Sequence, residues 1–136
     1  MKYIHKRMPE QPRVDYNNLT ETGKPNIYTG GVYLNYNGKP FTGFAIEADY
    51  STGERIIIWE QQYVNGEDIG WEISYHDNEM VDSESLSIGA TNVYFVNNDE
   101  EGNCLGDHFF SPDLLDELCE IIGEDPANAK PLDLKE

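Results

Sequence analysis

Apolar and polar positions alternate along much of the chain between residues 30 and 97. In 70–76, GWEISYH, Trp71, Ile73 and Tyr75 alternate with polar residues. A period of two is typical of a β-strand with one face turned to the protein interior. The pattern predicts strands in GGVYLNY, GFAIEADY, RIIIWEQQYV, GWEISYH, MVDSESLSIG and TNVYFVN. Because RIIIWE is apolar almost throughout, we expect it to be the most buried of them.

Turn signals recur between these runs at a regular spacing. Each signal is an Asn-Gly dipeptide, which accepts positive φ and favours a hairpin, followed after a short stretch by a second glycine. The first glycines of the two copies are 28 residues apart and the second glycines 27 apart. The second glycine of each copy is expected to let a neighbouring backbone or aromatic ring approach closely. The predicted turn residues are Asn37, Gly38, Gly43, Asn65, Gly66 and Gly70.

One segment near the C-terminus has the signals of a helix. In SPDLLDELCEIIG, Ser111 is placed to be the N-cap, Pro112 is at the first helical position and Gly123 is the stop. Asp113 and Asp116 fall in the positive first turn. The expected apolar face, which should pack on the sheet, consists of Leu114, Leu115, Leu118, Ile121 and Ile122.

These elements predict a mainly β, α+β protein: an antiparallel β-meander of repeated hairpins with one C-terminal helix packed on the sheet. A chain of 136 residues is expected to form a single domain, 1–136. Within it we expect an irregular N-terminal arm (1–22), a repeat-derived meander (23–98), the helix (111–123) and a polar tail (124–136). A lone hairpin cannot bury its face, whereas a row of them can.

Charge is the most unusual feature of the composition. The chain has twenty-six acidic and nine basic residues, which gives a formal net charge of −17. Residues 56–129 contain 18 carboxylates and no Lys or Arg. Such a surface repels nucleic acid and anionic lipid and attracts a basic partner. The simpler alternative is that the charge only keeps the protein soluble, although mixed surfaces normally intersperse both signs.

Neither a catalytic constellation nor a transition-metal motif is predicted, and no cofactor is expected. The three histidines, His5, His76 and His108, lack ligand spacing. The acidic segment 97–103 raises the question of calcium, but it lacks EF-hand spacing, so a solvated loop is favoured. Two cysteines make no disulfide framework, and Cys119, near the apolar side of the helix, is expected to be a buried thiol. The N-terminus has no apolar core typical of a signal or a membrane span, which predicts a cytoplasmic protein.

The repeated segments resemble the variant MORN-type repeat: an aromatic residue, Asn-Gly, a short stretch, Gly with an aromatic residue, and an aromatic-rich strand. One copy is YNGKPFTGFAIEADYSTGERI and the other YVNGEDIGWEISYHDNEMV; the likeness covers about residues 23–81. The second copy has Asp77-Asn78-Glu79 where a closing glycine is usual.

Bacterial proteins with this repeat variant include immunity proteins and antitoxins of polymorphic toxin and contact-dependent growth inhibition systems. The resemblance therefore implies a non-enzymatic protein, monomeric or in a 1:1 complex, that blocks one cognate toxin. The charge agrees with a basic toxin such as a nuclease. The alternatives are an acidic adaptor or structural binding protein without a toxin partner, and a small enzyme, which the missing constellation disfavours.

The predicted contact surface is acidic. Alternation in 70–76 places Glu72 on the face opposite Trp71, beside the turn acids Glu67 and Asp68, and we expect this acidic region rather than the N-terminal arm to meet the toxin. The aromatics Trp59, Trp71, Tyr63 and Tyr75 can be core residues or interface anchors, with the core favoured. The predicted partner-binding residues are Glu67, Asp68, Glu72, Asp77, Glu79, Asp82, Glu84, Asp99, Glu100 and Glu101.

Overall fold

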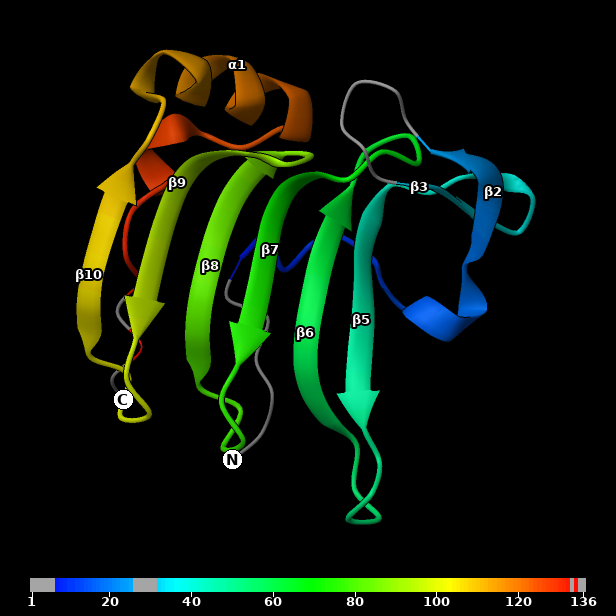
Figure 1. The fold of residues 1–136 in the computed structure, drawn as a ribbon, viewed down its shortest axis with the longest axis horizontal. Coiled ribbons are helices and arrows are strands. Elements are labelled where there is room, and N and C mark those ends of the chain that lie inside the picture. The colour runs from blue at the N-terminus through cyan, green and yellow to red at the C-terminus, as the bar shows by residue number, and fades with distance from the viewer. Residues whose placement is uncertain (1–6, 26–31, 133, 135–136) are drawn as a thin grey trace.

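The protein is mostly β-structure, with one α-helix packed near a sheet, in a computed structural model that describes residues 7–25, 32–132 and 134 (Figure 1). The strands are β1 (Arg13–Asp15), β2 (Thr20–Pro25), β3 (Val32–Tyr36), β4 (Lys39–Pro40), β5 (Gly43–Asp49), β6 (Ile56–Tyr63), β7 (Ile69–Tyr75), β8 (Val81–Ile88), β9 (Thr91–Asn98) and β10 (Cys104–Phe109). The helices are α1 (Pro112–Ile122) and two 3₁₀ turns, η1 (Tyr16–Asn18) and η2 (Pro126–Asn128).

Seven strands form the main sheet in the order β1-β5-β6-β7-β8-β9-β10. From β5 to β10 every strand pairs antiparallel with the next one in the chain, whereas β1 pairs parallel with β5. A second, three-stranded sheet has the order β2-β3-β4. The expectation of essentially one sheet is therefore wrong for β2, β3 and β4, because β3 pairs with β2 and β4 and not with β5.

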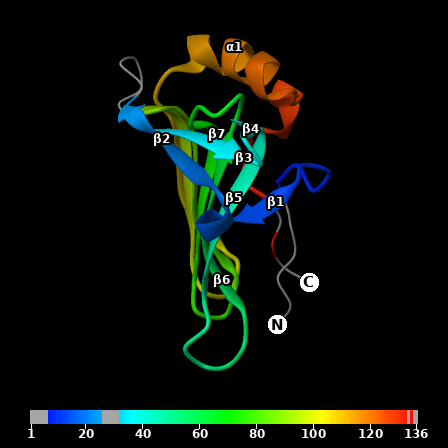
Figure 2. The ribbon, with the colours of Figure 1, turned by 90° about the vertical axis from the view of Figure 1, so that its right-hand side faces the viewer.

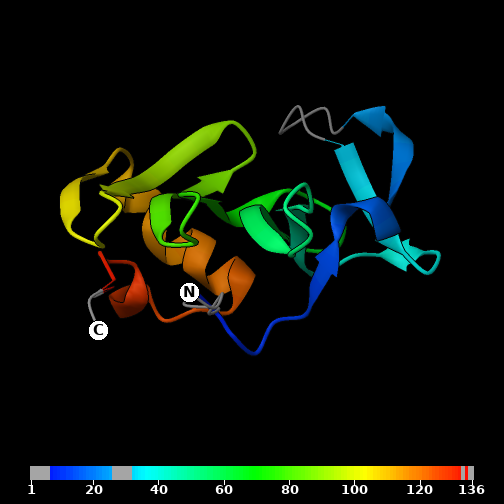
Figure 3. The ribbon, with the colours of Figure 1, turned by 90° about the horizontal axis from the view of Figure 1, so that it is seen from below.

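One face of the main sheet is covered and holds the core. Figures 2 and 3 show α1 and both terminal segments on the same side of the strands. Trp71 and Ile73 of β7 are buried there against α1, together with Met8 from the N-terminal segment and Ala129 from the C-terminal one. The other face carries Gln61, Glu72, Ser85 and Phe95 on adjacent strands, as well as Trp59. The predicted division of β7 into an apolar and a polar side is confirmed.

Both terminal segments differ from the prediction. The N-terminal arm was expected to be irregular, but it contributes β1, η1, the start of β2 and the buried residues Arg7 and Met8. The expected polar tail contains η2 and buries Ala129 and Leu134. In both cases a few apolar or ionic side chains in a polar sequence close the covered face of the sheet.

Two strand predictions also need correction. Residues 104–109 are not among the predicted strands, yet they form β10, the last strand of the main sheet. Within RIIIWE, Ile57 and Glu60 are buried but Ile58 is 39% exposed. The register of β6 against β5 shifts between the pairs Glu47–Trp59 and Ala48–Ile57, so Ile58 is an extra residue that bulges outward.

The predicted Asn-Gly turns have the expected backbone. Asn37 and Gly38 have φ of 52° and 80°, and Asn65 and Gly66 have φ of 50° and 85°. Positive φ at both central residues is the type I′ geometry that suits the twist of a hairpin. That these hairpins are copies of one sequence repeat remains a prediction.

The second glycines lie where another group comes close. A Cβ added to Gly43, at φ +148°, would be 2.6 Å from the carbonyl oxygen of Pro12 and 2.9 Å from the Phe41 ring. A Cβ on Gly70, at φ +118°, would be 2.2 Å from Oε1 of Gln62. Close approach was predicted at both positions, although at Gly70 the neighbour is an amide side chain.

Substitution of Gly43 is expected to be costly for this reason. Gly43→Ala should lower the free energy of unfolding by about 1–3 kcal/mol more than Gly53→Ala, because overpacking is added to the backbone strain. Gly53 is the matched control: it also has positive φ, +84°, but nothing lies within 4 Å of its added Cβ. Urea unfolding of the two variants measures the difference, and equal losses would contradict the close packing at Pro12.

The helix begins and ends as predicted, with differences in detail. Gly123 ends α1 in the left-handed conformation, at φ 78°, and Pro112 is in the first turn. Ser111 occupies the N-cap position without a side-chain cap hydrogen bond. Leu118 and Ile122 are buried, but Ile121, expected on the same face, is 43% exposed. None of the helices in the described residues is long and apolar enough to cross a membrane.

The two thiols should differ sharply in reactivity. Cys119 is buried, as predicted, and burial raises the pKa of its thiol to about 11, with Glu124, Asp116 and Asp125 adding to the shift, whereas Cys104 is exposed. Because the thiolate is the nucleophile, Cys119 should stay protonated and inert at neutral pH. We expect Ellman's reagent to titrate one thiol in the native protein and two in guanidinium chloride. Rapid modification of both in the native protein would contradict the packing of α1.

Candidate functional site

The arginines of the N-terminal segment are neutralised inside the protein. Arg7 is 2% exposed and forms an ion pair with the fully buried Glu84, with Nε 2.7 Å and Nη2 3.2 Å from the two carboxylate oxygens. Arg13 lies 3.4 Å from Oε2 of Glu60, which is also fully buried and accepts the Tyr75 hydroxyl at 2.6 Å. These two cations therefore do not offset the acidic surface.

Glu84 consequently cannot be a contact residue. Its inclusion in the predicted solvent-facing region is wrong, because its side chain points to the covered face of β8. Burial raises the pKa of Glu84, and the adjacent Arg7 guanidinium acts in the opposite direction.

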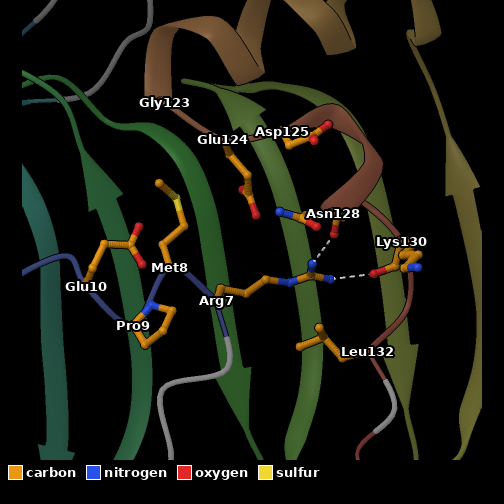
Figure 4. Close-up of a pocket in the computed structure, with 10 residues that line it drawn as sticks. All are labelled: Arg7, Met8, Pro9, Glu10, Gly123, Glu124, Asp125, Asn128, Lys130 and Leu132. Carbon is orange, nitrogen blue, oxygen red and sulfur yellow. Dashed lines mark hydrogen bonds between the residues drawn. The ribbon is translucent and has the colours of Figure 1, made fainter.

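Arg7 also joins the two ends of the chain. Its Nη1 donates to the carbonyl of Asn128 at 2.6 Å and its Nη2 to that of Lys130 at 2.7 Å (Figure 4). The guanidinium carbon lies 4.0 Å from the centre of the Trp71 ring, whose Nε1 donates to Glu124 at 2.7 Å. A hollow of about 380 Å³ lies beside this cluster. Since all three guanidinium nitrogens of Arg7 are already hydrogen-bonded, the cluster acts as a structural clamp and not as an anion site.

The remaining predicted contact residues do not form one cluster. Strand β7 separates them: Glu67 and Asp68 lie at the end of the sheet nearest α1, and Glu72 lies midway along the strand (Figure 1). Glu72 accepts the Trp59 indole N–H at 2.9 Å on the uncovered face. The others lie at the opposite end of the sheet, in or beside the β7–β8 turn and the β9–β10 loop: Asp77, Glu79, Asp82, Asp99, Glu100 and Glu101.

The β7–β8 turn and the β9–β10 loop are joined by a hydrogen bond, and a depression that is open to solvent lies beside them. Asn78 Nδ2 donates to the carbonyl of Glu100 at 2.8 Å. We call the depression, about 490 Å³ in volume, the acidic groove; it is lined by His76, Asp82, Asn98, Asp99, Glu100, Glu101 and Leu105. Glu100 and Glu101 are exposed, and Leu105 is 64% exposed.

Two polar groups define the inner part of the groove. His76 Nε2 lies 3.0 Å from the Asn98 carbonyl and 3.5 Å from Asp82 Oδ1. Asn98 is 3% exposed, and its Oδ1 has no hydrogen-bond partner. The carboxylates that line the groove suit a positively charged hydrogen-bond donor, such as a lysine or arginine side chain.

The loop beside the groove is organised by Asp99. Its Oδ1 accepts the backbone N–H groups of Glu101 at 3.0 Å and Asn103 at 2.8 Å, and its Oδ2 accepts Asn103 Nδ2 at 3.0 Å. Within the described part of the chain, His, Cys, Asp and Glu side chains form no group of three that could hold a metal ion. The carboxylate of Asp99 therefore serves the fold of the loop.

The aromatic residues divide between core and surface. Trp71 and Tyr63 are buried, at 0% and 6% exposure, so the core interpretation is confirmed for these two. Trp59 is half-buried on the uncovered face and makes an edge-to-face contact with Tyr16. Three further exposed apolar residues, which no sequence pattern indicated, lie on and directly after β10: Leu105, Phe109 and Phe110.

Comparison of the chain with protein-family models, with curated proteins and with solved structures gives no match.

Proposed function

We propose that this protein is an immunity protein or antitoxin that binds a cognate bacterial toxin domain and neutralises it. The toxin would be a basic protein, a nuclease with a cationic substrate cleft, and the acidic surface would occupy that cleft as a phosphate backbone does. The protein would act in the cytoplasm, without catalysis. Its main sheet would be a meander derived from repeated hairpins.

The observation that carries the proposal is uncompensated negative charge. Residues 56–129 supply 18 carboxylates without a Lys or Arg. Arg7 and Arg13 neutralise only two of these carboxylates, the buried Glu84 and Glu60. A surface of one sign steers an oppositely charged partner and raises the association rate.

Rescue from the toxin tests the proposal. The gene next to the one that encodes this protein would be expressed in a host cell, once alone and once together with this protein. Restored growth, together with inhibition of nuclease activity by the purified protein at a 1:1 ratio, supports an immunity role. Failure to restore growth with both proteins present at comparable levels would contradict it.

An acidic adaptor is the competing proposal, supported by the same charge. It would bind a basic protein without inhibiting any activity. Isolation of the native complex followed by an activity assay of the partner separates the two, because only an immunity protein abolishes the partner's activity.

A further inference from the structure

We propose that the outer edge of β10 binds an extended strand of a basic protein partner, which would become the eighth strand of the main sheet. The proposal deepens the proposed function, on which it rests for the existence of such a partner, by naming the mode of recognition: backbone pairing at a sheet edge.

The hydrogen-bond pattern identifies which backbone groups are presented. The N–H of Phe110 donates to the carbonyl of Val93 at 2.9 Å, so 110 and 93 are a hydrogen-bonded pair of the antiparallel ladder. The register Asp107↔Val96, His108↔Phe95, Phe109↔Tyr94 continues into that pair. Because the pairs alternate, the N–H and C=O groups of Asp107 and Phe109 point away from β9 to the edge of the sheet.

The end of β10 carries little of the usual protection against pairing. Natural sheets guard an edge with lysine, proline, a β-bulge or a very short strand. Strand β10 has six residues and contains neither lysine nor proline, and its irregularity lies between Cys104 and Gly106, before the residues that would pair. Leu105, Phe109 and Phe110 are 64%, 37% and 54% exposed. Among the described residues, β10 is the last strand of the sheet, and exposed apolar side chains flank its outer edge, which is what strand addition requires.

Charge selects a basic partner over a second copy of this chain. Pairing two β10 edges would bring together two molecules that each carry a formal charge of −17. The start of β10 adjoins the acidic groove, which is lined by Leu105 of β10 and by Asn98, Asp99, Glu100 and Glu101. A strand that lies along β10 can therefore place a lysine or arginine side chain in the groove.

Amide exchange with a defined probe tests this inference. The probe is an eight-residue peptide that alternates lysine and valine, and the control peptide has the same sequence with N-methyl groups on its central amides. In the protein alone, the amides of Asp107 and Phe109 should exchange fast and those of His108 and Phe110 slowly. The lysine–valine peptide should slow exchange at Asp107 and Phe109, and N-methylation should weaken binding at least tenfold.

Two protein variants separate backbone pairing from charge. Asp107→Pro removes one outward N–H, whereas Asp107→Ala removes the same carboxylate and keeps that N–H; only the proline variant should lose binding. If the proline variant does not fold, the comparison of the two peptides on the wild-type protein still tests backbone pairing.

The possible outcomes are distinct. Equal binding of both peptides, or binding without protection at Asp107 and Phe109, would overturn the inference. Concentration-dependent protection of these amides without peptide would show that a second copy occupies the edge and would also overturn it. Neither result depends on growth rescue, so a failure here is distinguishable from a failure of the proposed function.

Discussion

Replacing Arg7 by alanine is expected to lower the free energy of unfolding by about 3–5 kcal/mol, the usual loss when one partner of a buried ion pair is removed. The variant leaves the fully buried Glu84 without its cation. It also removes the hydrogen bonds to the carbonyls of Asn128 and Lys130, which hold the C-terminal segment on the sheet. Urea unfolding followed by tryptophan fluorescence measures the effect, since Trp71 lies against the guanidinium.

The matched control replaces both charges. Arg7→Met combined with Glu84→Leu leaves no buried charge unpaired, and such a replacement is often neutral or stabilising. We expect the double variant to be more stable than Arg7→Ala, although the two carbonyls still lose their donor. A double variant as unstable as Arg7→Ala would show that the carbonyl hydrogen bonds, and not the ion pair, are what matters.

The loss in Arg7→Ala should also depend on pH. Without Arg7, the pKa of Glu84 in the folded state rises further above its ordinary value of 4.5. An acid whose pKa is raised by folding binds its proton more tightly in the folded state than in the unfolded state. Its unfavourable contribution to the stability of the folded state is therefore absent at low pH and appears as the pH rises from the pKa of the unfolded state to that of the folded state. The deficit relative to the wild type should thus be larger at about pH 8 than at about pH 5. A constant deficit would mean that Glu84 does not ionise differently in the two proteins.

The antiparallel strands β5–β9 could be predicted from the sequence because their signals are local. Alternation in GWEISYH and positive φ at Asn65-Gly66 are properties of adjacent residues, and both are found in the structure. By contrast, β10 gives no alternation signal, because all six of its residues are exposed at the edge of the sheet. Its presence depends on pairing with β9.

The buried carboxylates could not be predicted from local pattern. Glu84 lies in the polar run DSES and resembles a solvent-facing residue, but its partner Arg7 is 77 positions away. The same long-range contacts hold the N-terminal arm, which was expected to be irregular, and the C-terminal segment, which was expected to be a polar tail. The division of the predicted acidic region has a simpler cause: a strand of seven residues spans roughly 20 Å, so acids before and after β7 cannot lie together.

Reversing the charge at the acidic groove is expected to reduce the association rate with the toxin about 10–100-fold at low salt, within the range that electrostatic steering supplies. The variant carries Asp77→Lys, Glu100→Lys and Glu101→Lys, three exposed positions at the same end of the sheet. Folding should be retained, because isolated surface charges contribute little to stability. Stopped-flow binding at low and high salt measures the rates, and high salt should bring the variant and the wild type closer together.

The matched control makes the same change of charge at the other end of the molecule. Asp116→Lys, Glu117→Lys and Glu120→Lys lie on the exposed side of α1, far from the acidic groove (Figure 1). Both triple variants raise the net charge by six units, so a general effect of net charge slows association equally in the two. A larger loss of association rate in the groove variant would show that the toxin first contacts that end of the sheet, beside the edge of β10. Equal losses would mean that the toxin senses only the overall charge, and an unchanged rate in both variants would reduce the acidic surface to a solubilising role.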